Sequence, residues 1–361
     1  MMVRLLLSRC RIILCVCVLA LLCAGCEHRP LEEMYWYENI FVRVYFDENI
    51  RNVSYGFYDE TKKKPEYSSP QAMRVAFFDD VTDKMVTERY LHDYGVDEKG
   101  YYIQGVLSVP DGKYNMMAYN FDVVDTKILN ANSYTQMTAY TSQLSESEAN
   151  RIFGTRSEIT EGEEVLCRQP DHLFVTKVEN IEVNSEELNH NRDTIKTEAN
   201  EFPVAETLVK TYYLQFNVKG VEHVRSAVAL ITGMAGSKNM YTGEMDKDNV
   251  ASIFFGLSNG KDKNRTSDEV SVAYASFNTF GKLPHTEGYI DITFEFNTIY
   301  NTVQTEKIRV TDMFETEIVK EKQWIIIDKV IEIVPPEDVV SGGGMSPGVN
   351  DWEEIEGSVT I

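Results

Sequence analysis

Hydrophobic and polar residues alternate with a period of two along most of the chain. Between Ile40 and Phe46 every second residue is apolar, which is the pattern of a strand with one buried face. The same alternation predicts further strands in the first half of the chain, over residues 72–79, 84–90, 100–109, 115–121 and 172–184. Pro110-Asp111-Gly112 supplies turn geometry between two of these strands.

The second half of the chain repeats this pattern. It predicts strands over residues 208–218, 223–232, 250–256, 269–280, 287–297, 304–311 and 323–334, with polar turn clusters such as residues 260–264 between them. Many strands without intervening helices indicate antiparallel sheets packed as sandwiches, and each half holds about enough strands for one sandwich. The sequence therefore predicts an all-β chain of two tandem antiparallel β-sandwich domains.

Only one helix has clear signals. Ser145 is placed as an N-cap with Glu148 three residues later, Ile152 and Phe153 form a short apolar face, and Gly154 follows. This spacing is a capping box, in which the two side chains bond to each other's backbone N–H groups. We expect a helix of two or three turns.

Two polar stretches suggest the domain limits. Residues 185–203 carry few large aliphatic side chains and end at Pro203, which is typical of a long loop or a linker. We place the domains at residues 39–204 and 205–336 on this basis. Residues 337–361 then form a glycine-rich linker and a carboxy-terminal strand.

The candidate assembly strand is that last segment. Gly342-Gly343-Gly344 gives a flexible spacer, and the apolar residues after it have strand character. They are Trp352, Ile355, Val359 and Ile361. Such a strand can pair with its own sheet or with the edge of a neighbouring molecule, and the sequence leaves both possibilities open.

The amino terminus has the organisation of an export signal. Arg4, Arg9 and Arg11 precede an apolar run that ends at Cys26, and the run is short for a membrane span. Its end, Cys23-Ala24-Gly25-Cys26, resembles the lipobox of bacterial lipoproteins, although Cys23 stands where leucine is usual. We expect residues 1–25 to be removed, Cys26 to carry lipid, and residues 26–38 to form a tether. An uncleaved anchor or an ordinary secretory signal is the alternative.

Size, charge and cysteines narrow the classes of function. Removing residues 1–25 leaves 336 residues with a net charge of −25, since the signal takes three of 35 cations and none of 57 acids. Such a charge disfavours nucleic acid and direct adsorption to anionic lipid. Four of the six cysteines lie in the signal, so beyond Cys26 only Cys167 remains. We expect Cys167 to be a buried free thiol.

The catalytic and metal-binding motifs are weak. Gly256-Leu257-Ser258-Asn259-Gly260 matches a nucleophile elbow, but no helix pattern follows the serine, so we interpret it as a hairpin turn. Residues 246–249 lack the glycine and distal glutamate of a calcium loop, and no histidine has metal-ligand spacing. Acidic pairs are expected by chance at this acid content, and residues 35–37 fit an aromatic strand edge better than a sugar-stacking platform. We predict no catalytic residue, no metal and no cofactor other than the lipid.

Several short motifs, taken in order, resemble one family. They are the lipobox at Cys26, Val109–Tyr114 with the following residues 116–121, Pro170–Phe174, Ala229–Ala235, Ser276–Gly281, Val310–Asp312, and Asn350–Trp352. Together they are similar to the fimbrillin-like lipoproteins of type V pili, and within them to the anchor and accessory subunits. The resemblance implies Greek-key sandwiches of transthyretin-like type.

The resemblance also implies a function. Stalk subunits of such pili lose an amino-terminal strand to an arginine-specific protease and polymerise by strand exchange. Arg43 and Arg51 lie in or after the first strand, and neither has the context of a cleavage site. We therefore expect a lipid-retaining, non-enzymatic subunit of surface fimbriae in the outer membrane, whose partners are other fimbrial subunits. A surface lipoprotein that binds glycan or host protein is the alternative, and a hydrolase would require converging carboxylates or a triad.

Overall fold

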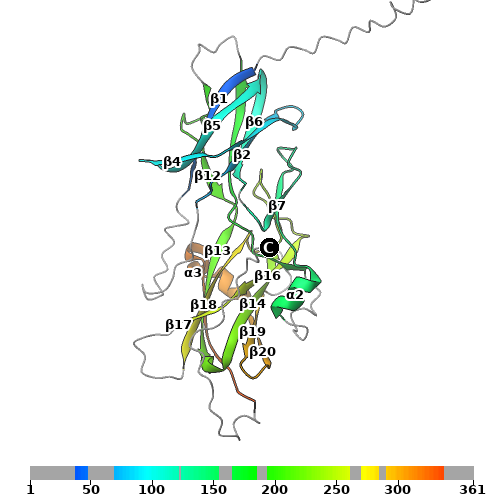
Figure 1. Cartoon of the computed structure of the whole chain (residues 1–361), viewed down its shortest axis with the longest axis vertical. Coiled ribbons are helices and arrows are strands. Elements are labelled where there is room, and N and C mark those ends of the chain that lie inside the picture. The colour runs from blue at the N-terminus through cyan, green and yellow to red at the C-terminus, as the bar shows by residue number, and fades with distance from the viewer. Residues whose placement is uncertain are drawn as a thin grey trace, which may run out of the picture. The chain divides into compact units, whose positions relative to one another are not determined.

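The protein is described by a computed structural model (Figure 1). It describes residues 37–47, 69–121, 123–153, 165–184, 193–260, 270–283 and 290–336. Strands dominate these ranges and helices are few. None of the helices in these ranges has the length and apolarity needed to cross a bilayer.

The first half of the chain forms a nine-stranded sheet. Its order is β3-β2-β6-β10-β12-β1-β5-β4, with β11 also paired to β1. The strands are β1 (Tyr37–Phe46), β2 (Met73–Asp79), β3 (Met85–Leu91), β4 (Asp93–Asp97), β5 (Gly100–Pro110), β6 (Gly112–Asn120), β10 (Phe174–Val183), β11 (Asp193–Thr194) and β12 (Val204–Thr207).

This sheet surrounds one hydrophobic core. Alternate residues of β1, β2, β5, β6 and β10 point into it, among them Val42, Phe77, Ile103 and Met116, all fully buried. Each such side chain stabilises the fold by about 1.5–3 kcal/mol relative to an exposed one. The two ends of the strand order, β3 and β4, are separated in sequence by His92 alone, so a single bent segment occupies both ends of the sheet.

The opposite face of the sheet carries a second core. Ala76, Phe78, Met117 and Tyr119 pack there against a three-stranded sheet of order β15-β8-β7. Its strands are β7 (Thr126–Leu129), β8 (Thr138–Thr141) and β15 (Ser237–Asn239).

Most of the second half of the chain, together with residues 165–167, forms a two-layer sandwich. One layer is the four-stranded sheet β17-β18-β13-β21, and the other is the five-stranded sheet β20-β19-β14-β16-β9. The strands are β9 (Val165–Cys167), β13 (Lys210–Lys219), β14 (Val224–Ala235), β16 (Val250–Gly256), β17 (Ser258–Gly260), β18 (Ser271–Thr279), β19 (Asp291–Thr298), β20 (Val303–Arg309) and β21 (Trp324–Glu332).

The core of this sandwich lies between the two layers. Phe216 of one layer and Phe294 of the other have ring centroids 4.5 Å apart, and Phe255 stacks on Phe277 at the same separation. The short helices η4 (Thr311–Glu315) and α3 (Glu317–Lys322) add Phe314 and Val319 to this core. A third short element, η3 (Val221–His223), follows β13.

The all-β sandwich fold predicted from the sequence is confirmed, and so is the short helix, α2 (Glu146–Phe153). The pairing, however, is not wholly antiparallel: β1 pairs in parallel with β11 and β12, β13 with β21, and β16 with β9. Two pairs, β15–β8 and β16–β9, join residues on either side of residue 204. The predicted domain boundary at that residue stays a prediction.

The interpretation of residues 256–260 as a hairpin turn is wrong. Gly256 ends β16, Leu257 is buried in the core, and Ser258 begins β17, which pairs antiparallel with β18. The chain passes here from one layer of the sandwich to the other. The sequence suggested a turn because no helix pattern follows Ser258, but Leu257 is buried and a paired strand follows it.

Candidate functional site

The residues predicted from sequence to attach lipid and to assemble lie outside the described ranges. These are Cys26, Trp352, Ile355, Val359 and Ile361. Their roles stay predictions. The described residues instead present two arrangements of interest, the first strand and a polar cluster around Arg168.

The first strand, β1, lies in the interior of its sheet. It has β5 on one side and β11 and β12 on the other, with Tyr45 paired to Val204 and Phe46 to Ala205. Its inward residues Ile40, Val42, Val44 and Phe46 all belong to the first core. Loss of this strand would therefore remove four core side chains and leave a gap between neighbouring strands.

Arg43 on the outer face of β1 is held from several sides. Its Nη2 and Nε atoms donate to Gln104 Oε1 at 2.6 and 2.9 Å, and Nη1 lies 3.3 Å from Asp97 Oδ2. The guanidinium lies 4.2 Å from the ring centroid of Tyr102 and 5.4 Å from that of Phe202. Because a protease must bind an arginine side chain and an extended backbone, this residue is poorly placed for cleavage in the folded protein. Arg51 lies outside the described residues.

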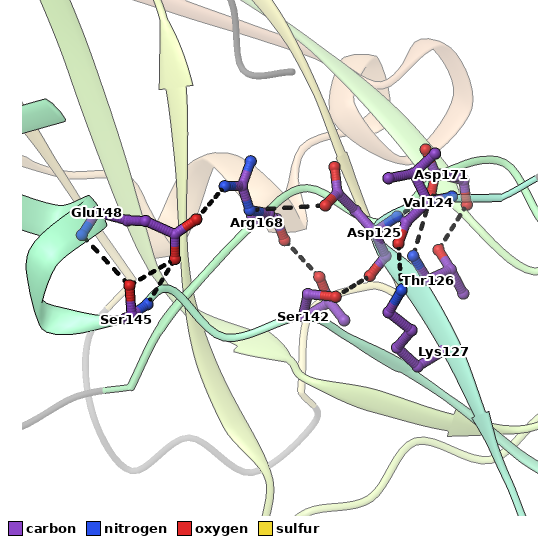
Figure 2. Close-up of polar contacts among 10 residues, drawn as sticks. Val124, Asp125, Thr126, Lys127, Ser142, Ser145, Glu148, Arg168 and Asp171 are labelled. Atoms are coloured by element: carbon purple, nitrogen blue, oxygen red, sulfur yellow. Dashed lines mark hydrogen bonds and ion pairs between the residues drawn. The ribbon is translucent and has the colours of Figure 1, made fainter. Parts of the chain in front are cut away.

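The polar cluster is centred on Arg168, which directly follows β9 (Figure 2). Its Nη2 atom donates to Glu148 Oε1 at 2.7 Å, and its Nε atom lies 3.6 Å from Asp125 Oδ1. The side chain is only 12% exposed. Burial, and next the charge of Asp171, raise the pKa of Asp125, while Arg168 opposes this shift.

Glu148 belongs to the predicted capping box, which is present in the structure. Ser145 N donates to Glu148 Oε2 at 2.9 Å, and Glu148 N donates to Ser145 Oγ at 3.3 Å. The hydrogen bond from the Ser145 backbone, then that from its hydroxyl and that from Arg168, lower the pKa of Glu148 to about 2. Arg168 thus connects the start of α2 to the β7 region.

Asp171 holds the segment that leads into β7. One carboxylate oxygen, Oδ2, accepts the backbone N–H groups of Val124, Asp125 and Thr126 at 2.9, 2.5 and 2.9 Å (Figure 2). Thr126 Oγ1 also donates to the backbone carbonyl of Asp171 at 3.2 Å. Three converging N–H groups on one anionic oxygen make a strong, charge-assisted contact.

Three of the motifs that carried the family resemblance meet beside this cluster. Asn120 donates from Nδ2 to the His172 carbonyl at 3.1 Å and accepts the Phe174 N–H at 2.7 Å. Asn278 N donates to Gln169 Oε1 at 2.9 Å. The motifs at residues 116–121 and 276–281 are thus joined by hydrogen bonds to the connecting segment at residues 169–174.

Burial sets the protonation state of two side chains near this cluster. Burial lowers the pKa of His172 to about 4, so the ring is neutral at neutral pH, and burial raises the pKa of the Cys167 thiol to about 11. Cys167 is buried and free, as predicted. Ser258 lies in a paired strand, not on the sharp strand-to-helix turn that a nucleophile elbow requires. No group of three metal-ligating side chains occurs within the described residues.

Residues 25–256 match the model of a protein family described as a domain of unknown function, DUF5119. The match spans well over half of the chain. The chain belongs to this family.

Relatives of this DUF5119 chain include a Bacteroides ovatus protein named "Putative fimbrium anchoring subunit Fim4B". The two are 24% identical over 357 residues, and the alignment covers 92% of each chain. This similarity confirms the resemblance to fimbrial anchor and accessory subunits that the sequence predicted.

Two solved structures are similar to this chain. The crystal structure of a "putative adhesin" from Bacteroides ovatus is 21% identical and covers 87% of this chain and 98% of its own, with a TM-score of 0.55. The fimbrial anchor protein Mfa2 from Porphyromonas gingivalis is 13% identical and covers 82% of this chain and 91% of its own, with a TM-score of 0.44. The first of these supports the two-sandwich fold of the DUF5119 chain.

Sequence reasoning did not find the Arg168 cluster. The cluster joins Arg168 to Glu148, 20 residues away, and Asp171 to N–H groups 45 to 47 residues away. The one feature of the sequence that pointed to this cluster was the motif Pro170–Phe174. The family resemblance included this motif but gave no role to Asp171.

Proposed function

We propose that this DUF5119 chain is a non-enzymatic structural subunit of a surface fimbria, in an anchoring or accessory position and tethered by lipid on Cys26. The observation that carries the proposal is the similarity to a named fimbrium anchoring subunit over 92% of both chains. The described strands supply what such a role needs, namely large rigid sheets and buried cores.

The position of β1 supports a subunit that keeps its first strand. β1 begins at Tyr37, eleven residues after Cys26, so the proposed lipid and the first core are linked by a short tether. Cleavage at Arg43 would cut an interior strand whose arginine contacts Gln104, Asp97 and Tyr102. A subunit that retains this strand also retains its link to the lipid.

The lipid anchor has a direct test. We expect radiolabelled palmitate to be incorporated into the protein in the native host, and Cys26→Ala to abolish the label, because the acyl chains need that cysteine. A single chain binds a membrane only marginally, so stable attachment requires two or more. Cys167→Ala, which changes a buried thiol, is the matched control and should keep its label. Equal labelling of the Cys26→Ala protein would refute the anchor.

Assembly is proposed to use strand addition, with the carboxy-terminal residues Trp352, Ile355, Val359 and Ile361 as the candidate strand. Deleting residues 345–361 should abolish incorporation into fimbriae while the protein remains folded and exported. Deleting the spacer residues 341–344 alone, which leaves the strand intact, is the control for length. Fimbriae that still contain the truncated protein would remove this strand from the proposal.

A further inference from the structure

A pocket lies where β1 ends and β12 begins. Its volume is about 450 Å³, within the range of small-ligand sites. It is lined by Tyr45, Phe46, Asp47, Lys99, Glu201, Phe202 and Val204. The turn between β4 and β5 supplies Lys99, and the loop before β12 supplies Glu201 and Phe202.

The walls of this pocket are held in place by the Arg43 network. Tyr45 donates its hydroxyl to Asp97 Oδ2 at 2.7 Å, and its ring centroid lies 6.0 Å from that of Phe202. Arg43 lies over the Phe202 ring and bonds Gln104, which in turn donates to Asp93 Oδ2 at 2.8 Å. Side chains fixed in this way lose little conformational entropy when a ligand binds.

The composition of the pocket selects the class of ligand. Two carboxylates, Asp47 and Glu201, disfavour an anion, and the ammonium of Lys99 disfavours a metal ion or another cation. The aromatic ring of Phe202 and the side chain of Val204, which is 50% exposed, add apolar surface beside these charged groups. A neutral molecule with one apolar face and a rim of hydroxyl groups fits both the charged and the apolar surface of the pocket. The aromatic ring covers the apolar face of such a molecule, and the charged side chains form hydrogen bonds with its hydroxyl groups.

We infer that this pocket is a carbohydrate-binding site that accepts a single pyranose ring. Phe202 packs against the C–H face of the sugar, and Glu201 and Lys99 bond its hydroxyl groups. The site does not depend on lipid attachment or on strand addition. It adds a ligand to the proposed fimbrial subunit, and its test is independent of the tests of the proposed function.

A second pocket, of about 600 Å³, provides an internal control. Lys177, Glu179, Glu198 and Tyr241 are among its lining residues. Two of its charged groups are already engaged, since Lys177 donates to the Tyr241 carbonyl and lies over that ring, and Glu179 accepts the Tyr134 hydroxyl at 3.2 Å. This pocket therefore has less to offer a sugar.

The test is a titration of the purified protein with the methyl glycosides of glucose, galactose, mannose and N-acetylglucosamine, followed by saturation-transfer NMR and calorimetry. We expect at least one glycoside to bind with a Kd of ~1–10 mM, the range that a single small ring reaches. Phe202→Ala and Glu201→Gln should each raise that Kd about tenfold or more. Glu198→Gln, the same change in the second pocket, should leave the Kd unaltered.

Folding is controlled by a second variant. Phe202→Leu keeps an apolar side chain of similar size but removes the ring, so it should fold normally and still weaken binding. Circular dichroism checks each variant. The proposal is overturned if none of the four glycosides binds up to ~20 mM, or if binding survives unchanged in Phe202→Leu and Glu201→Gln.

Discussion

The nine-stranded sheet and the two-layer sandwich both bury large apolar cores but differ in how their end strands are linked. In the nine-stranded sheet the two end strands, β3 and β4, are consecutive in the chain and joined through His92. In the sandwich the edge strands β20 and β21 belong to different layers and are linked by side chains. Gln304 Nε2 donates to the Glu332 carbonyl at 2.6 Å, and Lys329 forms an ion pair with Glu306.

This difference bears on how each region can take part in an assembly. An unpaired strand edge is a template for another chain, and proteins cover or charge such edges to prevent unwanted pairing. In the nine-stranded sheet the link between the two end strands is the chain itself, through His92. The side-chain links between β20 and β21 are non-covalent and therefore reversible.

Core substitutions should have the largest effect and show whether the two regions unfold together. Phe77→Ala in the nine-stranded sheet and Phe294→Ala in the sandwich each remove a fully buried ring. Each should lower the free energy of unfolding by about 3–5 kcal/mol, because a cavity remains. Urea unfolding monitored by circular dichroism measures this loss. Val303→Ala, at a 43% exposed position on β20, is the control.

The shape of the same unfolding curves sharpens the comparison. The second core contains both Phe78 of the nine-stranded sheet and Ala235 of β14 in the sandwich, so we expect one cooperative transition for each variant. Two separated transitions, with only one moved by each substitution, would mean that the regions unfold independently.

Removal of the Asp171 carboxylate should have the next largest effect. Asp171→Ala leaves the N–H groups of Val124, Asp125 and Thr126 without their shared acceptor, and should cost about 2–4 kcal/mol. Asp171→Asn should cost less, since the amide oxygen still accepts. Asp80→Ala, at an exposed position, should change the free energy of unfolding by under ~0.5 kcal/mol. A similar small value for Asp171→Ala would show that water replaces the carboxylate.

The sequence predicted the long strands well because each buries one face, and alternation over seven or more residues records that burial. β1 and β18 were found in this way. It missed β9, β11 and β15, which have only two or three residues and so carry no period. It also could not give the parallel pairing of β13 with β21, which depends on chain segments more than 100 residues apart.

The candidate site was predictable only where its interactions are local. Ser145 and Glu148 are three residues apart, so their capping box was visible in the sequence, and the structure contains it. Arg168 and Asp171 act on distant segments, and an arginine or aspartate in a polar stretch looks the same whether solvated or buried. The short β16–β17 connection was mistaken for a turn because the burial of Leu257 cannot be read from the sequence around it.

Lowering the pH should weaken the Arg168 cluster through Glu148, an effect that distinguishes this cluster from the apolar cores of the two sheets. The pKa of Glu148 is lowered from 4.5 to about 2 in the folded protein, so its stabilising contribution is present above pH 4.5 and is lost as the pH falls towards 2. Glu148→Gln should therefore cost about 1 kcal/mol at pH 6, a typical value for a cap, and almost nothing near pH 2. Urea titrations at the two pH values measure this. Glu146→Gln in the same helical turn should show no such change, and a cost for Glu148→Gln that is equal at both pH values would contradict the assignment.

The smallest expected effect concerns the link between β20 and β21. Lys329 is 56% exposed and Glu306 is 29% exposed, so their ion pair is well solvated. A double-mutant cycle with Lys329→Met and Glu306→Gln should give a coupling energy below ~1 kcal/mol. A coupling above ~2 kcal/mol would instead make this link a main support of the sandwich. If the coupling is small, the pair contributes little to the stability of the sandwich. The contact between β20 and β21 then opens at low cost, whereas β3 and β4 stay joined by the chain itself.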